Sequence, residues 1–265
     1  MTQAEPIVQA VLASRKYRTT AAHVVQHLAD AAVARYPDSD RAEAEVRRAL
    51  HLAVSAPCPA PLNVTAWRKR YAACKDAGER STVCRDLLQR HASTRERLPE
   101  MAQFYASIFS AVGPVHSVLD LGCGVNPAAL PWMGLPSDVR YHALDARSDI
   151  TSVIQAGFDA AGVHGLAEPA DLLGALRCEP ADVALMLKLL PALERLEPGS
   201  AIRLMRNVPA PALVVSFPTT SLGGAQRGMD QNYSQLMRVW LADEPWRTER
   251  LGFRTETAFI VWKQR

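Results

Sequence analysis

The 265-residue sequence lacks several features that would place it in a broad class of protein. It has no run of eighteen apolar residues, so no membrane-spanning helix is expected. Residues 1–6 lack the basic and then apolar order of a secretory signal. The five cysteines are odd in number and show no C-x-x-C spacing, which favours reduced thiols of a cytoplasmic protein over disulfides or zinc. The seven histidines show no ligand spacing either, so no metal site is predicted.

The glycine-rich turn at residues 117–127 lacks the third glycine of a dinucleotide-binding loop. A short apolar run ends in Asp120, Gly122 and Gly124 follow, and Asn126 stands where the third glycine would be. This order predicts a buried strand, a tight turn and a helix N-terminus. The glycines let the main chain approach a ligand closely. An acid beside a two-glycine turn suits a cationic ligand without phosphates, such as the amino-acid end of S-adenosylmethionine.

A second apolar run, at residues 139–144, also ends in an acid. Asp145 stands twenty-five positions after Asp120, where the second strand of a βαβ unit would end. A carboxylate there can accept hydrogen bonds from both hydroxyls of a ribose. The alternative is that Asp145 only caps the next turn.

A third acid, Asp171, follows the predicted strand at residues 165–170. Its carboxylate can face the amino group of an adenine, with Leu172 and Leu173 packing on the ring. It can equally be the N-cap of a helix over residues 172–176. Three acids at three successive strand ends are hard to obtain by accident, so the pattern favours a cofactor site.

Three further apolar segments predict strands and complete the fold class. Residues 181–187 and 212–218 are almost continuously apolar, as in central strands, and residues 257–262 form a terminal strand. Strands that alternate with helical stretches over residues 115–265 predict an α/β protein with a doubly wound, mostly parallel sheet. Ligands of such sheets bind beyond the carboxyl ends of the strands. The side chains expected to gather there are those of Asp120, Asp145, Asp171, Lys188 and Ser216.

The first hundred residues lack the alternation of strands and predict a bundle of three or more helices. Helical spacing recurs at residues 20–34 and from residue 39 or 40 to near residue 51, whereas the prolines of residues 56–61 require an extended segment. We therefore expect two domains, a helical one at residues 1–100 and a sheet domain at residues 101–265.

Charge is distributed unevenly between these two parts. Residues 1–100 hold 16 Lys and Arg against 11 Asp and Glu, whereas residues 101–265 hold 14 against 16, within a net charge of only +3. A single basic cluster is usually a solvated helix face, but three clusters favour a surface that contacts RNA phosphates without reading sequence. The residues predicted for that surface are Arg15, Lys16, Arg18, Arg47, Arg48, His51, Arg68, Lys69 and Arg70.

Five segments belong together as motifs of one known family: residues 91–98, 120–127, 187–194, 216–224 and 227–229. On these motifs the chain closely resembles the aminoglycoside-resistance 16S rRNA (guanine-N7) methyltransferases that act on guanosine 1405 of the decoding site. The resemblance runs essentially end to end and includes the helical N-terminal part. The Leu-Lys-Leu-Leu-Pro and Ser-Phe-Pro-Thr elements are specific, because they are not general methyltransferase features.

The resemblance implies a fold and a cofactor. The fold would be a class I, Rossmann-like methyltransferase sheet behind a helical extension that docks on the 30S ribosomal subunit, and the cofactor would be S-adenosylmethionine. Arg97 would approach the carboxylate of its methionine part. The full set of residues predicted to bind the cofactor is Arg97, Asp120, Gly122, Gly124, Asp145, Asp171 and Leu172.

The resemblance also implies a reaction, methyl transfer to N7 of guanosine 1405 in 16S rRNA of the assembled 30S subunit, by a monomeric enzyme that confers aminoglycoside resistance. Guanine N7 carries a lone pair and no proton, so catalysis needs placement rather than a general base. The base must first be turned out of its helix. Met229 would pack near it, Arg227 would hold a phosphate, and Lys188 would donate to guanine O6 or a phosphate unless it merely reaches solvent. Glu194 also stands at a position that matters for activity in the family.

Other functions stay open at this point. A methyltransferase that acts on another rRNA position is one alternative. A methyltransferase for a protein or a small molecule would keep the three acids without needing the basic extension. A non-catalytic factor that binds the 30S subunit would keep the extension and tolerate the loss of Asp145 or Gly122. The presence of both residues argues against that factor.

Overall fold

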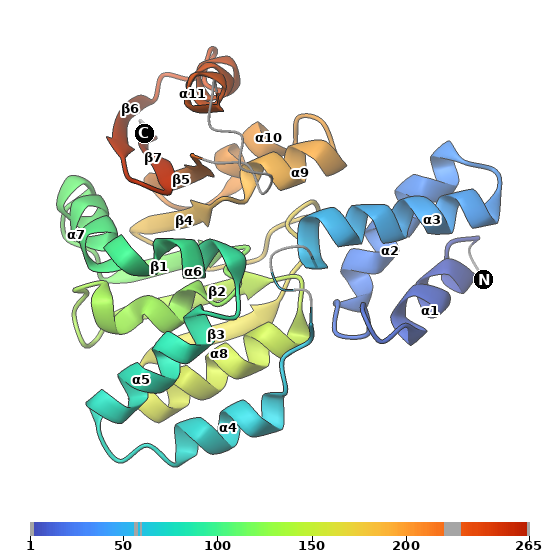
Figure 1. Ribbon diagram of the computed structural model, residues 1–265. Helices are drawn as coiled ribbons and strands as arrows, with labels where there is room; N and C mark the ends of the chain where they lie inside the picture. Colours follow the sequence, from blue (N-terminus) through green and yellow to red (C-terminus); the bar gives the residue numbers. More distant parts are fainter. Residues whose placement is uncertain (1–2, 56–57, 59, 220–228, 264–265) are drawn as a thin grey trace.

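The computed structural model describes residues 3–55, 58, 60–219 and 229–263. The first helices form a small bundle that stands beside the sheet, as the blue lobe in Figure 1. The bundle has an apolar core separate from that of the sheet, in which Val11, Val25 and Leu50 are fully buried. The elements of the bundle are α1 (Glu5–Ala13), α2 (Ala22–Arg35), α3 (Ser39–Leu50) and the π-helical turn η1 (His51–Ser55).

The next group of helices packs on the sheet instead of on the bundle. Trp67, Leu87 and Phe104 are buried in the same core as the strands. A functional division of the chain at residue 100 stays a prediction, and by packing the helices from α4 onward share the core of the sheet. These elements are α4 (Val64–Ala72), α5 (Ala77–Leu88), α6 (Ala92–Arg97), the 3₁₀ turn η2 (Leu98–Glu100) and α7 (Met101–Val112).

The predicted doubly wound sheet is present, with seven strands in the order β3-β2-β1-β4-β5-β7-β6. The first five strands are parallel, and β7 runs antiparallel to both of its neighbours. Strand β6 was not predicted, because its sequence is largely exposed and charged and shows no apolar alternation. The strands are β1 (Ser117–Leu121), β2 (Arg140–Asp145), β3 (His164–Pro169), β4 (Val183–Leu187), β5 (Ala212–Pro218), β6 (Arg247–Gly252) and β7 (Glu256–Trp262).

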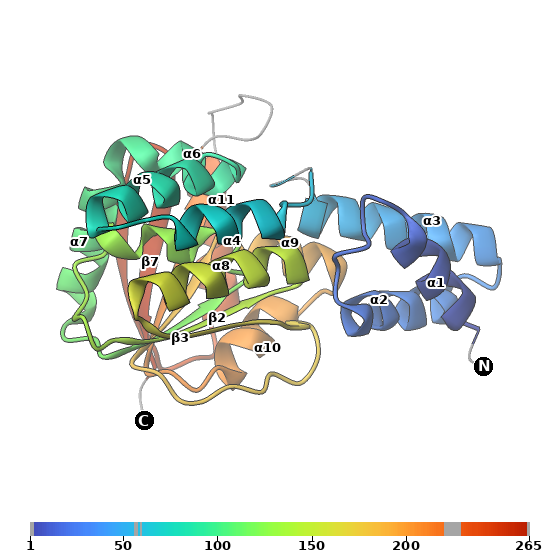
Figure 2. The ribbon, with the colours of Figure 1, turned by 90° about the horizontal axis from the view of Figure 1, so that it is seen from below.

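Helices cover both faces of this sheet, as Figure 2 shows from below. One face buries α4, α5, α7 and α8 (Ser148–Ala161), and the other buries α9 (Leu190–Leu196), α10 (Ser200–Asn207) and α11 (Met229–Trp240). The central strands are therefore buried on both sides, which explains their continuous apolar sequence. No helix among the described residues is long and apolar enough to cross a membrane.

The glycine turn leads into a helix as predicted, the 3₁₀ helix η3 (Asn126–Trp132), inside which Pro131 removes a backbone donor. The local alternative of a helix after Asp171 was wrong. Residues 172–176 form no helix. There the Leu173 side chain is buried in the sheet core and Gly174 interrupts the segment, so the chain runs as an irregular loop.

Candidate active site

A cavity of about 540 Å³ opens at the carboxyl ends of the parallel strands. Its volume is typical of a small-molecule or cofactor site. The N-terminal bundle closes one side of it with the apolar side chains of Val24, Leu28 and Leu52. The predicted site residues that line this cavity are Arg97, Asp120, Gly122, Asp145, Asp171, Leu172 and Lys188. The topology of the sheet therefore brings together acids that are far apart in the sequence.

Asp120 lies at the floor of the cavity with only 1% of its surface exposed. Its Oδ2 accepts hydrogen bonds from Asn126 Nδ2 and from the Tyr141 hydroxyl, both at 2.8 Å. Burial raises the pKa of Asp120 to about 6, in spite of these two donors. A carboxylate held in this way gains stability from a cation, which fits the ammonium end of an amino acid.

The glycine turn and Asp145 are joined by a backbone hydrogen bond. Gly122 and Gly124 have φ of +60° and +49°, so both need the left-handed freedom of glycine. The Gly124 N–H donates to Asp145 Oδ2 at 2.8 Å, and the Arg147 N–H donates to Asp145 Oδ1 at 3.0 Å. Asp145 thus caps the turn before α8 and also lines the cavity. Burial raises the pKa of its carboxyl.

Asp171 does not cap a helix, since none follows it. Its Oδ1 accepts the N–H of Leu173 at 2.9 Å, and its Oδ2 lies 2.6 Å from Nδ1 of His27, which comes from α2 of the bundle. His27 escaped the sequence analysis because its partner is 144 positions away and a single histidine on a helix carries no pattern. Leu172 lines the cavity beside Asp171, which agrees with the prediction that it packs on an adenine ring.

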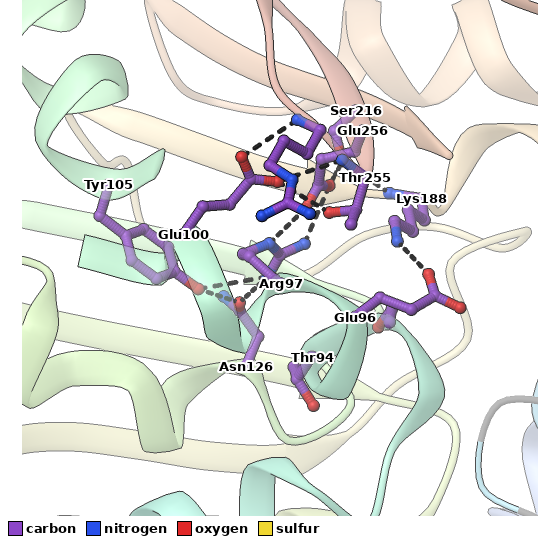
Figure 3. Close-up of polar contacts among 12 residues, drawn as sticks. Thr94, Glu96, Arg97, Glu100, Tyr105, Asn126, Lys188, Ser216, Thr255 and Glu256 are labelled. Atoms are coloured by element: carbon purple, nitrogen blue, oxygen red, sulfur yellow. Dashed lines mark hydrogen bonds and ion pairs between the residues drawn. The ribbon is translucent and has the colours of Figure 1, made fainter. Parts of the chain in front are cut away.

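A buried network surrounds Arg97 (Figure 3). Arg97 is 1% exposed and makes a bidentate ion pair with Glu256, while its Nη1 donates to Asn126 Oδ1 at 2.8 Å and to the Tyr105 hydroxyl at 3.2 Å. Burial disfavours the charge of Glu256, but the guanidinium outweighs it and holds the pKa of Glu256 below its usual value. Ser216, expected at this edge, donates to Glu256 Oε2 at 2.7 Å.

These contacts use four of the five N–H groups of Arg97, and the fifth has no acceptor among the described residues. Glu256 and Tyr105 were missed by the sequence analysis. Glu256 is the first residue of the last strand, and only the antiparallel pairing of β7 with β5 carries it to the motif residues. A charged residue at the start of an apolar strand is usually solvated, so the pattern gave no signal.

Lys188 follows β4 with φ of +58°, and it alone among the described non-glycine residues has a positive φ. Its backbone N–H donates to Ser216 O at 3.0 Å, and its Nζ donates to Glu96 Oε2 at 2.7 Å. The lysine side chain is 11% exposed, so the alternative that it simply reaches solvent is wrong. The strained backbone and the ion pair together hold the ammonium at the cavity wall.

The other residues predicted for catalysis are only partly accounted for. Arg227 lies outside the described residues, and Met229 begins α11 while its side chain lies outside the description. Glu194 accepts the N–H groups of Gly199 at 2.8 Å and Ala201 at 3.1 Å, so it holds the turn into α10.

The predicted basic surface is divided between the bundle and α4. Arg15, Arg18, Arg68 and Lys69 are exposed. The remaining residues have neighbours: Lys16 Nζ lies 3.0 Å from His51 Nδ1, and the arginines pair with acids on the same or a neighbouring helix, as Arg47 with Glu43, Arg48 with Glu45 and Arg70 with Asp86.

Comparison with known proteins identifies relatives over nearly the whole chain. A 16S rRNA (guanine(1405)-N(7))-methyltransferase of Micromonospora echinospora is 38% identical over 264 residues, which cover 98% of this chain and 96% of the relative. A protein of the same name from Serratia marcescens is 33% identical and covers 96% of each chain. Two solved structures are similar in fold. The 16S rRNA methyltransferase RmtF in complex with S-adenosyl-L-homocysteine has a TM-score of 0.83 at 29% identity and covers 100% of this chain and 99% of its own. The 16S rRNA methylase RmtB has a TM-score of 0.79 at 28% identity and covers 98% of both chains.

The predicted fold, cofactor and enzyme class are confirmed by these likenesses. The sheet is that of a class I, S-adenosylmethionine-dependent methyltransferase. The family model of ribosomal RNA methyltransferases named FmrO matches residues 13–261. The chain therefore belongs to the FmrO family of ribosomal RNA methyltransferases.

Proposed function

We propose that this protein transfers a methyl group from S-adenosylmethionine to N7 of guanosine 1405 in 16S rRNA. The observation that carries the proposal is the convergence of Asp120, Asp145 and Asp171 on one cavity in a chain whose full-length relatives bear this activity in their names. The modification would take place in the assembled 30S subunit and would confer aminoglycoside resistance.

The residues around the cavity fit the cofactor in charge and shape. A Cβ on Gly122 would lie 2.6 Å from Leu189 Cδ1 and one on Gly124 would lie 2.8 Å from His91 Nε2, so the glycines let these two side chains of the cavity wall pack directly on the turn. The Asp120 carboxylate suits the ammonium, Asp145 the ribose hydroxyls and Asp171 the adenine amino group, because each group to be bound is a hydrogen-bond donor. Leu172 offers an apolar surface to the adenine ring. The remaining N–H of Arg97 suits the carboxylate.

S-adenosylmethionine supplies a methyl group carried on a positively charged sulfur. Guanine N7 has a lone pair and no proton, so the protein has no proton to remove. The task of its side chains is to place N7 in line with the methyl group and to exclude competing orientations. Lys188 can donate to guanine O6 or to a phosphate if it leaves Glu96, and Met229 and Arg227 are proposed to hold the flipped base and a phosphate.

The proposed target explains the basic extension. Residues 1–100 would dock on rRNA through their exposed arginines and lysines, and residues 101–265 would carry out methyl transfer. The phosphate contacts of such a surface give affinity without reading base sequence. A protein that modifies ribosomal subunits works in the cytoplasm, and we propose that it does so as a monomer.

The test is incubation of the purified protein with labelled S-adenosylmethionine and 30S subunits, followed by borohydride and aniline cleavage at 7-methylguanosine. One cleavage at position 1405 is the expected result, and naked 16S rRNA should be a poor substrate. Asp145→Ala is the control, since it should bind 30S subunits but transfer no label. Label in the RNA without cleavage would show that the methyl group is transferred to an atom other than guanine N7. Cofactor binding without any label in 30S subunits would exclude the proposed substrate.

A further inference from the structure

A polar side chain of the N-terminal bundle, His27, contacts Asp171, an acid in the wall of the cofactor cavity. Its Nδ1 lies 2.6 Å from Asp171 Oδ2. An ionised carboxylate only accepts hydrogen bonds, so the histidine must donate its Nδ1–H. The other ring nitrogen, Nε2, lies 3.7 Å from Glu197 Oε2. The ring thus stands between two acids of the methyltransferase part and is 30% exposed, against 15% for Asp171.

The helix that carries His27 is fixed to the cavity at a second place. Immediately before α2, the Ala21 N–H donates to Ala146 O at 2.8 Å, and the Thr19 carbonyl accepts the Ser148 N–H at 2.8 Å. Ala146 directly follows Asp145. The start of α2 is therefore held by the loop after β2, and its middle by the loop after β3.

The same face of α2 forms part of the cavity wall. Val24 and Leu28 line the cavity and stand one helical turn apart, with His27 beside them on that face. Val24 is buried, so the helix is held by apolar packing as well as by hydrogen bonds. The packed helix therefore fixes the backbone position from which the His27 side chain extends.

Asp171 itself stands on a segment without regular structure. Residues 170–182 contain no helix or strand. Apart from His27, the donor to its carboxylate within the described part of the chain is the N–H of Leu173, two positions away on the same loop. The Leu173 side chain is buried in the sheet core, and its carbonyl accepts from Arg203 Nη2 at 3.2 Å, so this bond ties the carboxylate to the sheet through its own loop. His27 supplies the one hydrogen bond to this carboxylate, among those of the described residues, that comes from a separate packed element.

We propose that His27 is a positioning residue that holds Asp171 in the orientation that accepts the adenine amino group. The inference rests on the proposed function, because it takes Asp171 as the adenine acceptor. It makes the helical extension a contributor to cofactor affinity and to selectivity for adenine, although His27 itself touches no cofactor atom. Two oxygens with about four lone-pair sites leave room for adenine beside both present donors.

The first experiment measures the dissociation constant of S-adenosylhomocysteine for the full-length protein by calorimetry. His27→Ala should weaken binding about tenfold, since an ordered hydrogen bond to a charged group is lost. His27→Asn should restore most of the affinity, because the asparagine amide places an N–H near the position of Nδ1. The matched control is His23→Ala, an exposed histidine on the same helix, which should bind like the unchanged protein. Thermal unfolding of each variant shows whether the fold is kept.

The second experiment uses a ligand without the adenine amino group, the inosine analogue of S-adenosylhomocysteine. The unchanged protein should prefer the adenine ligand, and His27→Ala should lose that preference as Asp171→Ala does. A purely structural role for His27 would weaken both ligands equally and would overturn the inference. Unchanged affinity in His27→Ala with weakened binding in Asp171→Ala would also overturn it, while leaving the adenine role of Asp171 intact. Unchanged binding in Asp171→Ala would instead refute the proposed adenine site.

Discussion

Replacement of Gly124 by alanine tests how the glycine turn builds the cofactor site. Gly124 has φ of +49°, a conformation that costs a residue with a Cβ about 1–2 kcal/mol. The new Cβ would also lie 2.8 Å from His91 Nε2 and 3.1 Å from His91 Cε1. The ring has little freedom to retreat, because its Nδ1 lies 2.9 Å from Ser93 Oγ. Burial lowers the pKa of His91 to about 3, so the crowded ring is neutral at pH 7.

The magnitude follows from adding these two effects. Crowding of a packed site costs about 1–3 kcal/mol, so Gly124→Ala should lower the free energy of unfolding by about 2–5 kcal/mol in total. Gly134→Ala isolates the backbone effect, because Gly134 has φ of +67° and nothing within 4 Å of the added Cβ. The difference between the two variants therefore measures the contact with His91. Because the Gly124 N–H also holds Asp145, cofactor affinity should fall about tenfold or more in Gly124→Ala alone.

The assay combines urea unfolding with calorimetric binding of S-adenosylhomocysteine. The double variant Gly124→Ala with His91→Ala should recover part of the lost stability, because the clash is removed while the backbone cost remains. Equal stability and equal affinity in Gly124→Ala and Gly134→Ala would refute the reasoning. The cost of the positive φ would then account for both variants, without any effect of the contact with His91.

Three further outcomes are expected. The native state holds the proton of Asp120 more tightly than the unfolded chain, since burial raises its pKa from 3.8 to about 6, so stability should fall as pH rises through this window. Asp120→Asn should remove that fall and raise the free energy of unfolding near pH 7 by at most about 3 kcal/mol, as urea unfolding at pH 4 and pH 7 would measure. Lys188→Ala and Lys188→Gly should both lose turnover on 30S subunits far more than they lose cofactor affinity. The glycine variant should be about 1 kcal/mol more stable than the alanine variant, because residue 188 has a positive φ. An equal loss of turnover and affinity would make Lys188 a binding residue. Charge removal at Arg68, Lys69 and Arg70 should weaken 30S binding in a sedimentation assay and spare cofactor binding, and unchanged 30S affinity would exclude α4 from the docking surface.

Much of the fold could be predicted because its signals are local. The runs that became β1, β4, β5 and β7 are mostly apolar over the length of a strand, because these strands are buried on both faces of the sheet. In β2 the apolar residues Tyr141, Ala143 and Leu144 gave a weaker signal of the same kind. Strand β6 carried no such signal, since five of its six residues are exposed and its pairing depends on β7. The helix expected after Asp171 was wrong for a related reason: the burial of Leu173 in the sheet core outweighed local helical preference.

Some residues of the site could likewise be predicted from the sequence, whereas others are brought to it only by the tertiary structure. The sequence alone determined the acids at the ends of three successive strands and the two glycines between them, because strand ends and left-handed turns are properties of neighbouring residues. Only the tertiary structure paired Arg97 with Glu256, 159 positions away, and His27 with Asp171, 144 positions away. These partners are chosen by the pairing of β7 with β5 and by the seating of α2 on the loops after β2 and β3. Contacts of that kind arise from the packing of whole elements, so no local pattern of residues encodes them.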